Sequence, residues 1–473
     1  MLPSPLMDAA RARAAASLET ARVESIAAGG AGVARLEGRA VFIPWTAPGD
    51  VVRFRILADK GKYLRGELAE VLEPSPWRRE PPCPYWAACG GCPLQQINPE
   101  GQAQARRRIF LDALARIGKM DLPVPLQAPG PDSTRFGYRT RVRFQVKGKE
   151  IGFFAPGSRR LVPVENCLLA EPAVESALAR VRRLLGSASA ARGIEAVEIT
   201  SLGPDPDEGA GIFLHPPGSR DRRADTLSSG TRAEWDTYCR EAGHPLAVAG
   251  ERAPSATPAW TAAYSLPLPG EGGREEILRV SPESFLQPNR AGNRALVEAA
   301  VNWARTPEGA DPADATPPGG ATAVDLYCGA GNFTLPLARL FARVAGVEAN
   351  PYALYDAEAN RRAAGLGNVR FLRREAGRAD PGEIIDALEG ERPAAVLLDP
   401  PRRGALEAIP LVTALASRRI LYVSCNPATF ARDARALAKA GYRMGSASMI
   451  PMFPNTAHTE TVTSWFMGSA PIG

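Results

Sequence analysis

The sequence predicts an α/β protein with three parts: an N-terminal OB-like β-barrel, a mixed α/β central domain and a C-terminal doubly wound, Rossmann-like domain. The 473 residues are too many for one hydrophobic core, and 45% of them are apolar, which is ordinary for a globular protein. Apolar runs alternate with Gly and Asp turns near the N-terminus, whereas buried strands alternate with helical patterns from Thr322 onward. The expected limits are 1–19 for an extension, 20–76 for the barrel, 77–285 for the central domain and 286–473 for the C-terminal domain.

The N-terminal barrel is predicted from three apolar runs. Residues 33–43, 50–56 and 64–72 have the period-two character of antiparallel strands. This spacing indicates a small β-barrel and does not by itself indicate a function, although OB-type barrels commonly bind single-stranded nucleic acid. Residues 1–17 are rich in Ala and Arg and have no secretory cleavage pattern. No run of about 18 apolar residues appears, so we expect a cytoplasmic protein without a membrane span.

A cysteine cluster marks the start of the central domain. Cys83, Cys89 and Cys92 lie within ten residues, and Cys167 follows further along the chain. The odd total of seven cysteines argues against a disulfide framework. Four thiolates suit either tetrahedral zinc or a [4Fe–4S] cluster, and the spacing does not separate these. Such a site would be structural or redox-sensing, and four unrelated thiols are the alternative.

Basic residues are concentrated in one stretch of the chain. Residues 101–147 hold ten Lys and Arg against three Asp, a net charge of +7, so the rest of the chain, at −1, is about neutral. A helix is predicted at 102–119, and Arg139, Arg141 and Arg143 would share one side of a strand at 136–146. Aromatic and basic residues interleave in this strand, which favours RNA binding. A solvated, charged face is the alternative.

The C-terminal domain is predicted to contain a parallel sheet. Five buried strands are expected at 323–327, 344–348, 369–372, 394–399 and 419–424, and a Pro-, Gly- and Asp-rich linker at 306–320 precedes them. Ligands of such sheets bind outside the carboxyl ends of the strands. Polar groups fall at these ends, namely Asp325, Glu348, Asp399, Ser424 and Cys425.

A glycine-rich turn at Asp325–Phe333 indicates a cofactor site. Gly329 and Gly331 let the backbone approach a ligand, but the third glycine of the dinucleotide fingerprint is missing. Glu348 ends the next strand, where an acid can bind both hydroxyls of a ribose. A sugar-bearing cofactor without a required pyrophosphate is S-adenosylmethionine, which we therefore expect.

Cys425 is the candidate nucleophile. It ends the fifth strand and is followed by Asn426 and Pro427, which direct it to the ligand edge. A thiolate that adds to C6 of uracil makes C5 nucleophilic, so that C5 can take a methyl group and then lose its proton to a base. Glu460 is the candidate base, with His458 as a competitor that is better explained by a structural hydrogen bond.

Several motifs together resemble one known family. They are the four cysteines, Phe285–Asn289, Asp325–Thr334, Asp399–Gly404, Ser424–Pro427 and Phe453–Glu460. They resemble the RNA uracil-C5 methyltransferases, specifically the iron–sulfur branch that modifies 23S ribosomal RNA, over nearly the whole chain from residue 20.

The resemblance implies a TRAM barrel that binds RNA, a [4Fe–4S] cluster rather than zinc, and a methyltransferase domain at 286–473. It makes Cys425 the nucleophile and Glu460 the base. It also implies S-adenosylmethionine contacts from Gln287, Tyr327, Asn332, Glu348 and Asp399. The helix at 100–118 could then pack on the catalytic domain. No protein partner is implied, and a monomer is expected.

The sequence departs from the family pattern at a few positions. Leu286 and Pro288 replace a bulkier aromatic residue and a valine, and Asn455 stands where a histidine is frequent. Because the transfer-RNA branch typically lacks the cysteine set and the barrel, 23S ribosomal RNA is favoured as the target. The rival functions are an RNA-binding assembly factor without turnover, methylation of transfer RNA, and methylation of cytosine C5. Retention of both Cys425 and Glu460 argues against the first.

Overall fold

The computed structural model describes residues 18–127, 135–187, 189–218, 227–269, 275–305 and 320–468. Most of the expected extension and most of the expected linker at 306–320 lie outside these residues. The chain forms two compact units: residues 1–112 with 455–458, and residues 113–454 with 459–473. A short stretch near the C-terminus therefore belongs to the N-terminal unit.

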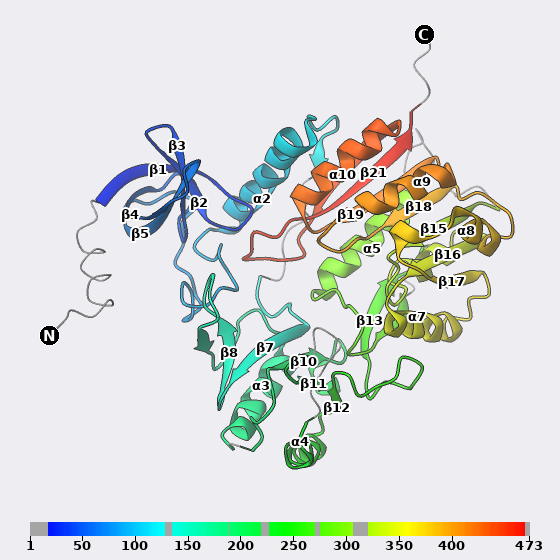
Figure 1. The fold of residues 1–473 in the computed structure, drawn as a ribbon, viewed down its shortest axis with the longest axis horizontal. Helices are drawn as coiled ribbons and strands as arrows, with labels where there is room; N and C mark the ends of the chain where they lie inside the picture. The colour runs from blue at the N-terminus through cyan, green and yellow to red at the C-terminus, as the bar shows by residue number, and fades with distance from the viewer. Residues whose placement is uncertain are drawn as a thin grey trace, which may run out of the picture. The chain divides into compact units, whose positions relative to one another are not determined.

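The first unit contains a closed five-stranded barrel with the strand order β1-β2-β3-β5-β4 (Figure 1). Its buried side chains include Val23, Val41, Val52 and Phe54, which point inward from alternating positions. The predicted barrel is confirmed. The strands are β1 (Leu18–Ile26), β2 (Gly32–Leu36), β3 (Arg39–Ile43), β4 (Val51–Asp59) and β5 (Tyr63–Glu73).

Asn455 is a buried residue of the first unit. Its φ of 66° lies in the left-handed region, which Asn tolerates better than most residues. Its backbone N–H donates to Gln102 Oε1 (2.9 Å), and its side-chain oxygen accepts from Arg79 Nη2 (2.8 Å). Asn455 thus fixes a turn to α2 (Pro99–Ala113). Helix α2 is followed directly by a π-helical segment, Leu114–Gly118.

The central part of the second unit is a six-stranded sheet with the order β12-β11-β10-β7-β8-β9. Two helices, α3 (Pro172–Leu185) and α4 (Ser229–Ala242), accompany it. The strands are β7 (Arg141–Lys147), β8 (Glu150–Phe154), β9 (Leu161–Pro163), β10 (Ala196–Ser201), β11 (Ala210–His215) and β12 (Leu246–Val248). A separate pair is formed by β13 (Ala262–Pro267) and β14 (Glu275–Val280).

Arg141 on β7 does not serve as an exposed basic residue. Its side chain is 12% exposed and lies 3.5 Å from Glu198 Oε1 in an ion pair. It also donates from Nη1 to the carbonyl oxygen of Ser284 (2.7 Å). The expectation of a basic, RNA-facing row therefore does not hold for Arg141, because internal contacts occupy its guanidinium.

The largest sheet has eight strands in the order β17-β16-β15-β18-β19-β21-β20-β6. The five predicted strands are present and parallel, namely β15 (Thr322–Leu326), β16 (Arg343–Glu348), β17 (Val369–Arg373), β18 (Ala395–Leu398) and β19 (Arg419–Ser424). The sequence analysis missed three further strands, β6 (Leu126–Gln127), β20 (Tyr442–Ile450) and β21 (Glu460–Met467). Of these, β21 is antiparallel to β19, and this pairing decides the geometry of the site.

Helices flank this sheet in the doubly wound manner expected for parallel strands (Figure 1). They are α5 (Arg290–Arg305), α6 (Thr334–Ala338), α7 (Pro351–Ala363), α8 (Pro381–Ala387), α9 (Ile409–Leu415) and α10 (Pro427–Lys439). The turn after α2 packs on α10, where a Cβ on Gly118 would come within 3.0 Å of the Ala431 carbonyl oxygen. Among the described residues, no helix is long and apolar enough to cross a membrane.

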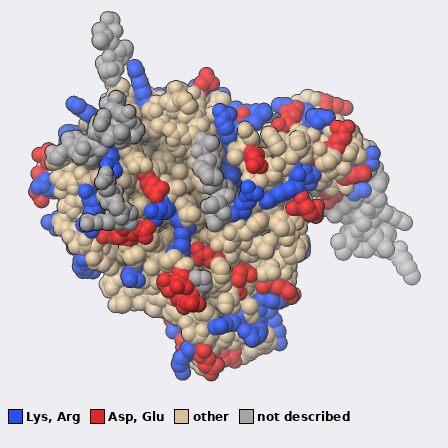
Figure 2. All heavy atoms as spheres, turned by 180° about the vertical axis from the view of Figure 1, so that it is seen from behind, with Lys and Arg blue, Asp and Glu red and all other residues tan. Residues whose placement is uncertain are grey.

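The charged surface does not by itself mark a binding face. On the face drawn in Figure 2, Lys and Arg lie among Asp and Glu. In the barrel, basic residues form ion pairs with acidic ones on neighbouring strands, as in Arg53 with Glu70 at 2.9 Å. The distribution of charge on this face therefore does not identify an RNA-binding surface.

Candidate active site

The pairing of β19 with β21 brings the two proposed reacting side chains to the same edge of the sheet. Ser424, the last residue of β19, lies opposite Thr461, the second residue of β21, and the Thr461 hydroxyl donates to the Ser424 carbonyl oxygen (3.4 Å). Cys425 follows the end of one strand, and Glu460 begins the other. Cys425 is half-buried, whereas Glu460 is only 3% exposed.

Two acids surround Cys425 and affect its titration. Burial is the largest cause that raises the pKa of the Cys425 thiol to about 11, and the neighbouring carboxyls of Glu460 and Asp399 contribute to this rise. Burial likewise holds the pKa of Glu460 well above its usual range, with a further contribution from Asp399. Burial also raises the pKa of Asp399 itself, to about 7. All three groups therefore keep their protons to a higher pH than they would in water.

Arg402 supplies the opposing charge. It lowers the pKa of both the Cys425 thiol and the Glu460 carboxyl. Its backbone carbonyl oxygen accepts hydrogen bonds from Asn426 Nδ2 (3.0 Å) and from the Thr429 hydroxyl (3.1 Å) at the start of α10. Arg402 lies within the Asp399–Gly404 motif, although no role was predicted for it from the sequence. The two prolines before it, which stiffen the turn, were the available signal.

The glycine-rich loop has the backbone that its sequence requires. Gly331 adopts a φ of 98°, which is strained for residues with a Cβ, and Tyr327 and Gly329 also have positive φ. The backbone N–H groups of Tyr327 and Cys328 both donate to the Val347 carbonyl oxygen (2.8 and 3.1 Å), which ties the loop to the end of β16.

Glu348 is oriented by backbone groups on both sides. Its Oε2 accepts from Gly329 N (3.2 Å), and its Oε1 accepts from Asn350 N (2.7 Å). Each carboxylate oxygen has a second lone pair for a ligand. The Glu348 carboxylate is therefore suited to accept hydrogen bonds from the two hydroxyls of a ribose, the role predicted for the end of this strand.

The buried Asp325 has an unsatisfied oxygen, and the sequence analysis did not include it among the cofactor ligands. Its Oδ2 accepts from the Thr334 hydroxyl (2.5 Å), whereas its Oδ1 has no hydrogen-bond partner among the described residues. Burial raises the pKa of Asp325 to about 8. A buried polar atom without a partner is costly, so a ligand or a water is expected to satisfy it.

The remaining predicted cofactor residues lie near this loop or are linked to it. Asn332 exchanges two hydrogen bonds with Asn293 of α5, at 2.8 and 2.9 Å between amide nitrogen and oxygen. Gln287 is 9% exposed, and its backbone carbonyl oxygen accepts from the Tyr264 hydroxyl (2.9 Å). Asn293 therefore connects the helix after Gln287 with the glycine-rich loop.

The predicted metal site is not present as a formed group. Cys83, Cys89, Cys92 and Cys167 are all half-buried, but no three His, Cys, Asp or Glu side chains in the described ranges come together as a metal-binding group. The first three belong to the first unit and Cys167 to the second. Gly91 N lies 3.4 Å from Cys89 Sγ, and the Cys83 thiol contributes to a raised pKa of Cys89 after burial.

Other predicted residues also lie outside the Cys425 cluster. His458 is exposed and belongs to the first unit, where its backbone N–H donates to the Thr456 hydroxyl (3.2 Å). Cys239 is a buried residue of α4, and burial raises its pKa to about 12.

Known proteins resemble the chain over nearly its full length. The tRNA (uracil-5-)-methyltransferase family model matches residues 270–464, and the TRAM domain model matches residues 17–69. The 23S rRNA (uracil(1939)-C(5))-methyltransferase RlmD of Pseudomonas entomophila is 33% identical over 94% of this chain and 93% of its own length. An uncharacterised RNA methyltransferase of Aquifex aeolicus is 30% identical over 93% of this chain and 96% of its own.

A solved structure shares the fold. The tRNA (uracil-54, C5)-methyltransferase of Pyrococcus abyssi, determined with S-adenosyl-L-homocysteine, matches 94% of this chain and 99% of its own with a TM-score of 0.65 and 20% identity. The identity of the bacterial relatives over nearly the whole chain, together with the two domain matches, is decisive. The chain belongs to the family of S-adenosylmethionine-dependent RNA uracil-C5 methyltransferases with a TRAM domain.

Proposed function

We propose that this enzyme methylates C5 of one uridine in 23S ribosomal RNA through a covalent bond between Cys425 and C6 of the base. The observation that carries the proposal is the placement of Cys425 and Glu460 at adjacent strand ends, beside Asp399. A nucleophile and a base that act on neighbouring carbons of one ring must converge in this way. Acting on ribosomal RNA, the protein would work in the cytoplasm.

The proposed chemistry uses the two side chains in sequence. The Cys425 thiolate bonds to C6, and the electron pair of the C5–C6 double bond moves into the ring as an enolate. S-adenosylmethionine supplies the methyl group, which C5 takes as the methyl–sulfur bond breaks. Glu460 then removes the C5 proton, the double bond re-forms, and the C6–sulfur bond breaks to return the thiolate. One proton is released overall.

Arg402 has a role in this scheme through its charge. Burial and two acids favour the protonated thiol, and the positive charge of Arg402 partly offsets them by favouring the thiolate. The target base must also leave its stack to reach Cys425, at a cost of a few kcal/mol that contacts in the site must offset.

The residues at the strand ends fit the cofactor that the family uses. Glu348 would bind the ribose hydroxyls, while Tyr327, Asn332, Asp399 and Gln287 would line the remaining site. The unsatisfied Asp325 Oδ1 is the structural sign of a missing polar partner. We add Asp325 to the proposed set on this ground.

The target is inferred from the relatives rather than from the fold. The Pseudomonas relative at 33% identity is named for 23S rRNA, which favours that substrate. The transfer-RNA branch is expected typically to lack the cysteine set and the barrel, but the P. abyssi tRNA enzyme matches 94% of this chain in fold. The barrel alone therefore does not choose between the two RNAs.

Mapping of 5-methyluridine tests the target. In a deletion strain, one 23S rRNA uridine is expected to lose its methyl group and to regain it with the intact gene but not with Cys425→Ala. Loss of 5-methyluridine from transfer RNA instead would contradict the proposed substrate. An unchanged RNA in the deletion strain would favour the alternative, an assembly factor without turnover, and 5-methylcytidine loss would indicate cytosine chemistry.

We also propose that the four cysteines hold a [4Fe–4S] cluster rather than zinc. The donor chemistry supports this, since four half-buried thiols offer the ligands that such clusters require. Anaerobically purified protein is expected to contain iron and acid-labile sulfide with a broad visible absorption, and Cys89→Ser should remove both. Stoichiometric zinc without sulfide would contradict the proposal.

A further inference from the structure

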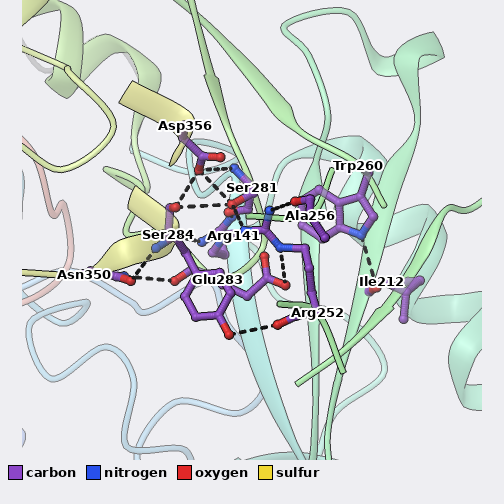
Figure 3. A network of polar contacts seen from close by, with 11 residues as sticks. Arg141, Ile212, Arg252, Ala256, Trp260, Ser281, Glu283, Ser284, Asn350 and Asp356 are labelled. Carbon is purple, nitrogen blue, oxygen red and sulfur yellow. Dashed lines mark hydrogen bonds and ion pairs between the residues drawn. The ribbon is translucent and has the colours of Figure 1, made fainter. Parts of the chain in front are cut away.

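The turn Ser281–Ser284, whose polar contacts Figure 3 shows, precedes in the chain the segment that carries Gln287. It follows β14 directly and is closed by a hydrogen bond from Ser284 N to the Ser281 carbonyl oxygen (3.2 Å). Gln287 lies three residues beyond the turn and is almost buried. The turn is therefore one anchor of the segment that carries Gln287.

Asp356 of α7 holds this turn with a single carboxylate oxygen. Its Oδ2 accepts from Ser281 N (2.9 Å), from the Ser281 hydroxyl (2.7 Å) and from the Ser284 hydroxyl (2.5 Å), as Figure 3 shows. Asp356 is 4% exposed. Hydrogen bonds to a charged acceptor are stronger than neutral ones, and a buried carboxylate requires them.

Two arginines bind further groups of the turn. Arg141 donates to the carbonyl oxygens of Ser284 (2.7 Å) and Ser281 (3.3 Å). Arg252 forms an ion pair with Glu283 (3.0 Å), and both side chains are about 10% exposed. With its carbonyls and hydroxyls engaged from opposite sides, the turn has few alternative conformations.

The same helix also contacts the glycine-rich loop. One helical turn after Asp356, Asn360 accepts from Arg279 N (2.9 Å) and donates to the carbonyl oxygens of Arg279 (2.9 Å) and Ala330 (3.0 Å). Ala330 lies between the two loop glycines. Near the start of the helix, Asn350 Nδ2 donates to the Glu283 carbonyl oxygen (3.3 Å). Helix α7 thus links the Gln287 segment to both sides of the cofactor site.

We propose that Asp356 is a positioning residue that fixes Gln287 for cofactor binding. This inference rests on the proposed contact of Gln287 with S-adenosylmethionine. Removing the carboxylate leaves three donors of one turn without their acceptor, so the turn relaxes and Gln287 moves with it. The chemistry at Cys425 does not involve Asp356, so the expected defect is in cofactor affinity.

Binding of S-adenosylhomocysteine, measured by calorimetry on the full chain, tests the proposal. We expect Asp356→Ala to weaken binding about tenfold, which corresponds to the loss of roughly one charged hydrogen bond. Ser284→Ala, a milder change should the first variant fold poorly, is expected to weaken it about threefold. Asp356→Asn keeps an acceptor and should recover part of the affinity.

Asp380→Ala is the matched control. Asp380 caps α8 through a hydrogen bond from Gly382 N (2.8 Å). Its removal should lower the melting temperature because α8 loses this cap. The affinity of the Asp380→Ala variant for S-adenosylhomocysteine should equal that of the unmodified enzyme. An equal loss of affinity in Asp380→Ala and Asp356→Ala would mean that general destabilisation is the cause, which overturns the positioning role.

A double-mutant cycle of Asp356→Ala with Gln287→Ala tests two claims separately. They are the positioning role of Asp356 and the proposed contact of Gln287 with the cofactor. If Asp356 acts through Gln287, Asp356→Ala costs little further affinity once Gln287 is absent. Fully additive losses would overturn the inference and leave the proposed Gln287 contact intact. An unchanged affinity of Gln287→Ala alone would overturn that contact and the inference together.

Discussion

Replacing Cys425 with Ala is expected to abolish methyl transfer, with a rate reduction of at least about four orders of magnitude, as for loss of other enzymatic nucleophiles. Without a thiolate at C6, C5 of uracil remains too weak a nucleophile to take the methyl group. Transfer of labelled methyl groups to an RNA transcript measures the effect. Binding of RNA and of S-adenosylhomocysteine should persist, because Cys425 follows β19, which β18 separates from β15 and its glycine-rich loop.

Cys239→Ala is the matched control for this variant. Cys239 is a buried thiol on α4, 3% exposed, and its removal should leave the rate of methyl transfer near that of the unmodified enzyme. Appreciable turnover by Cys425→Ala, within about a hundredfold of the unmodified rate, would remove the covalent mechanism. It would leave the family assignment untouched.

Replacing Glu460 with Gln is expected to lower the rate by about 10²- to 10⁴-fold, the usual contribution of a general base. The amide has the size of the carboxyl but cannot accept the C5 proton, so the ring should methylate and then remain attached to Cys425. Denaturing electrophoresis of enzyme mixed with RNA and S-adenosylmethionine detects this attachment. Glu383→Gln, at an exposed ion pair with Arg374, should show neither effect.

The pH dependence follows from the same two groups. Both act in their deprotonated forms, and burial raises the pKa of each, so kcat/KM for the unmodified enzyme should rise with pH through the neutral range. In Glu460→Gln the acid beside Cys425 is gone, which lowers the pKa of the thiol. The rise that remains should therefore move to lower pH.

The parallel strands were predictable because each is a short apolar run with a polar residue at its end. The pairing that places Glu460 beside Cys425 was not, because it joins two segments separated by α10 and β20 and depends on which edge of the sheet β21 joins. The local sequence pattern predicts that a segment forms a strand, but it does not predict which other strand it pairs with. Glu460 could be named as a candidate base from the sequence, and the fold supplied its position beside Cys425.

Charge patterns were the least informative signal. Arg141 has the alternating position of an exposed basic residue, yet Glu198 and the Ser281–Ser284 turn take up its guanidinium. The role of Asn455 was likewise not predictable from the residues around it. Its left-handed φ places it in a turn that belongs to the first unit. In both cases the partners lie far away in the sequence, and only the folded chain identifies them.

The covalent bond between Cys425 and RNA is the central claim, and its direct test is peptide mapping of the trapped complex. Glu460→Gln would be incubated with RNA and S-adenosylmethionine, digested with protease and nuclease, and analysed by mass spectrometry. The account predicts a methylated uridine linked to the peptide that contains Cys425, and no adduct in the Cys425→Ala, Glu460→Gln double variant. A nucleotide attached to any other residue, or an adduct that persists in the double variant, would contradict it.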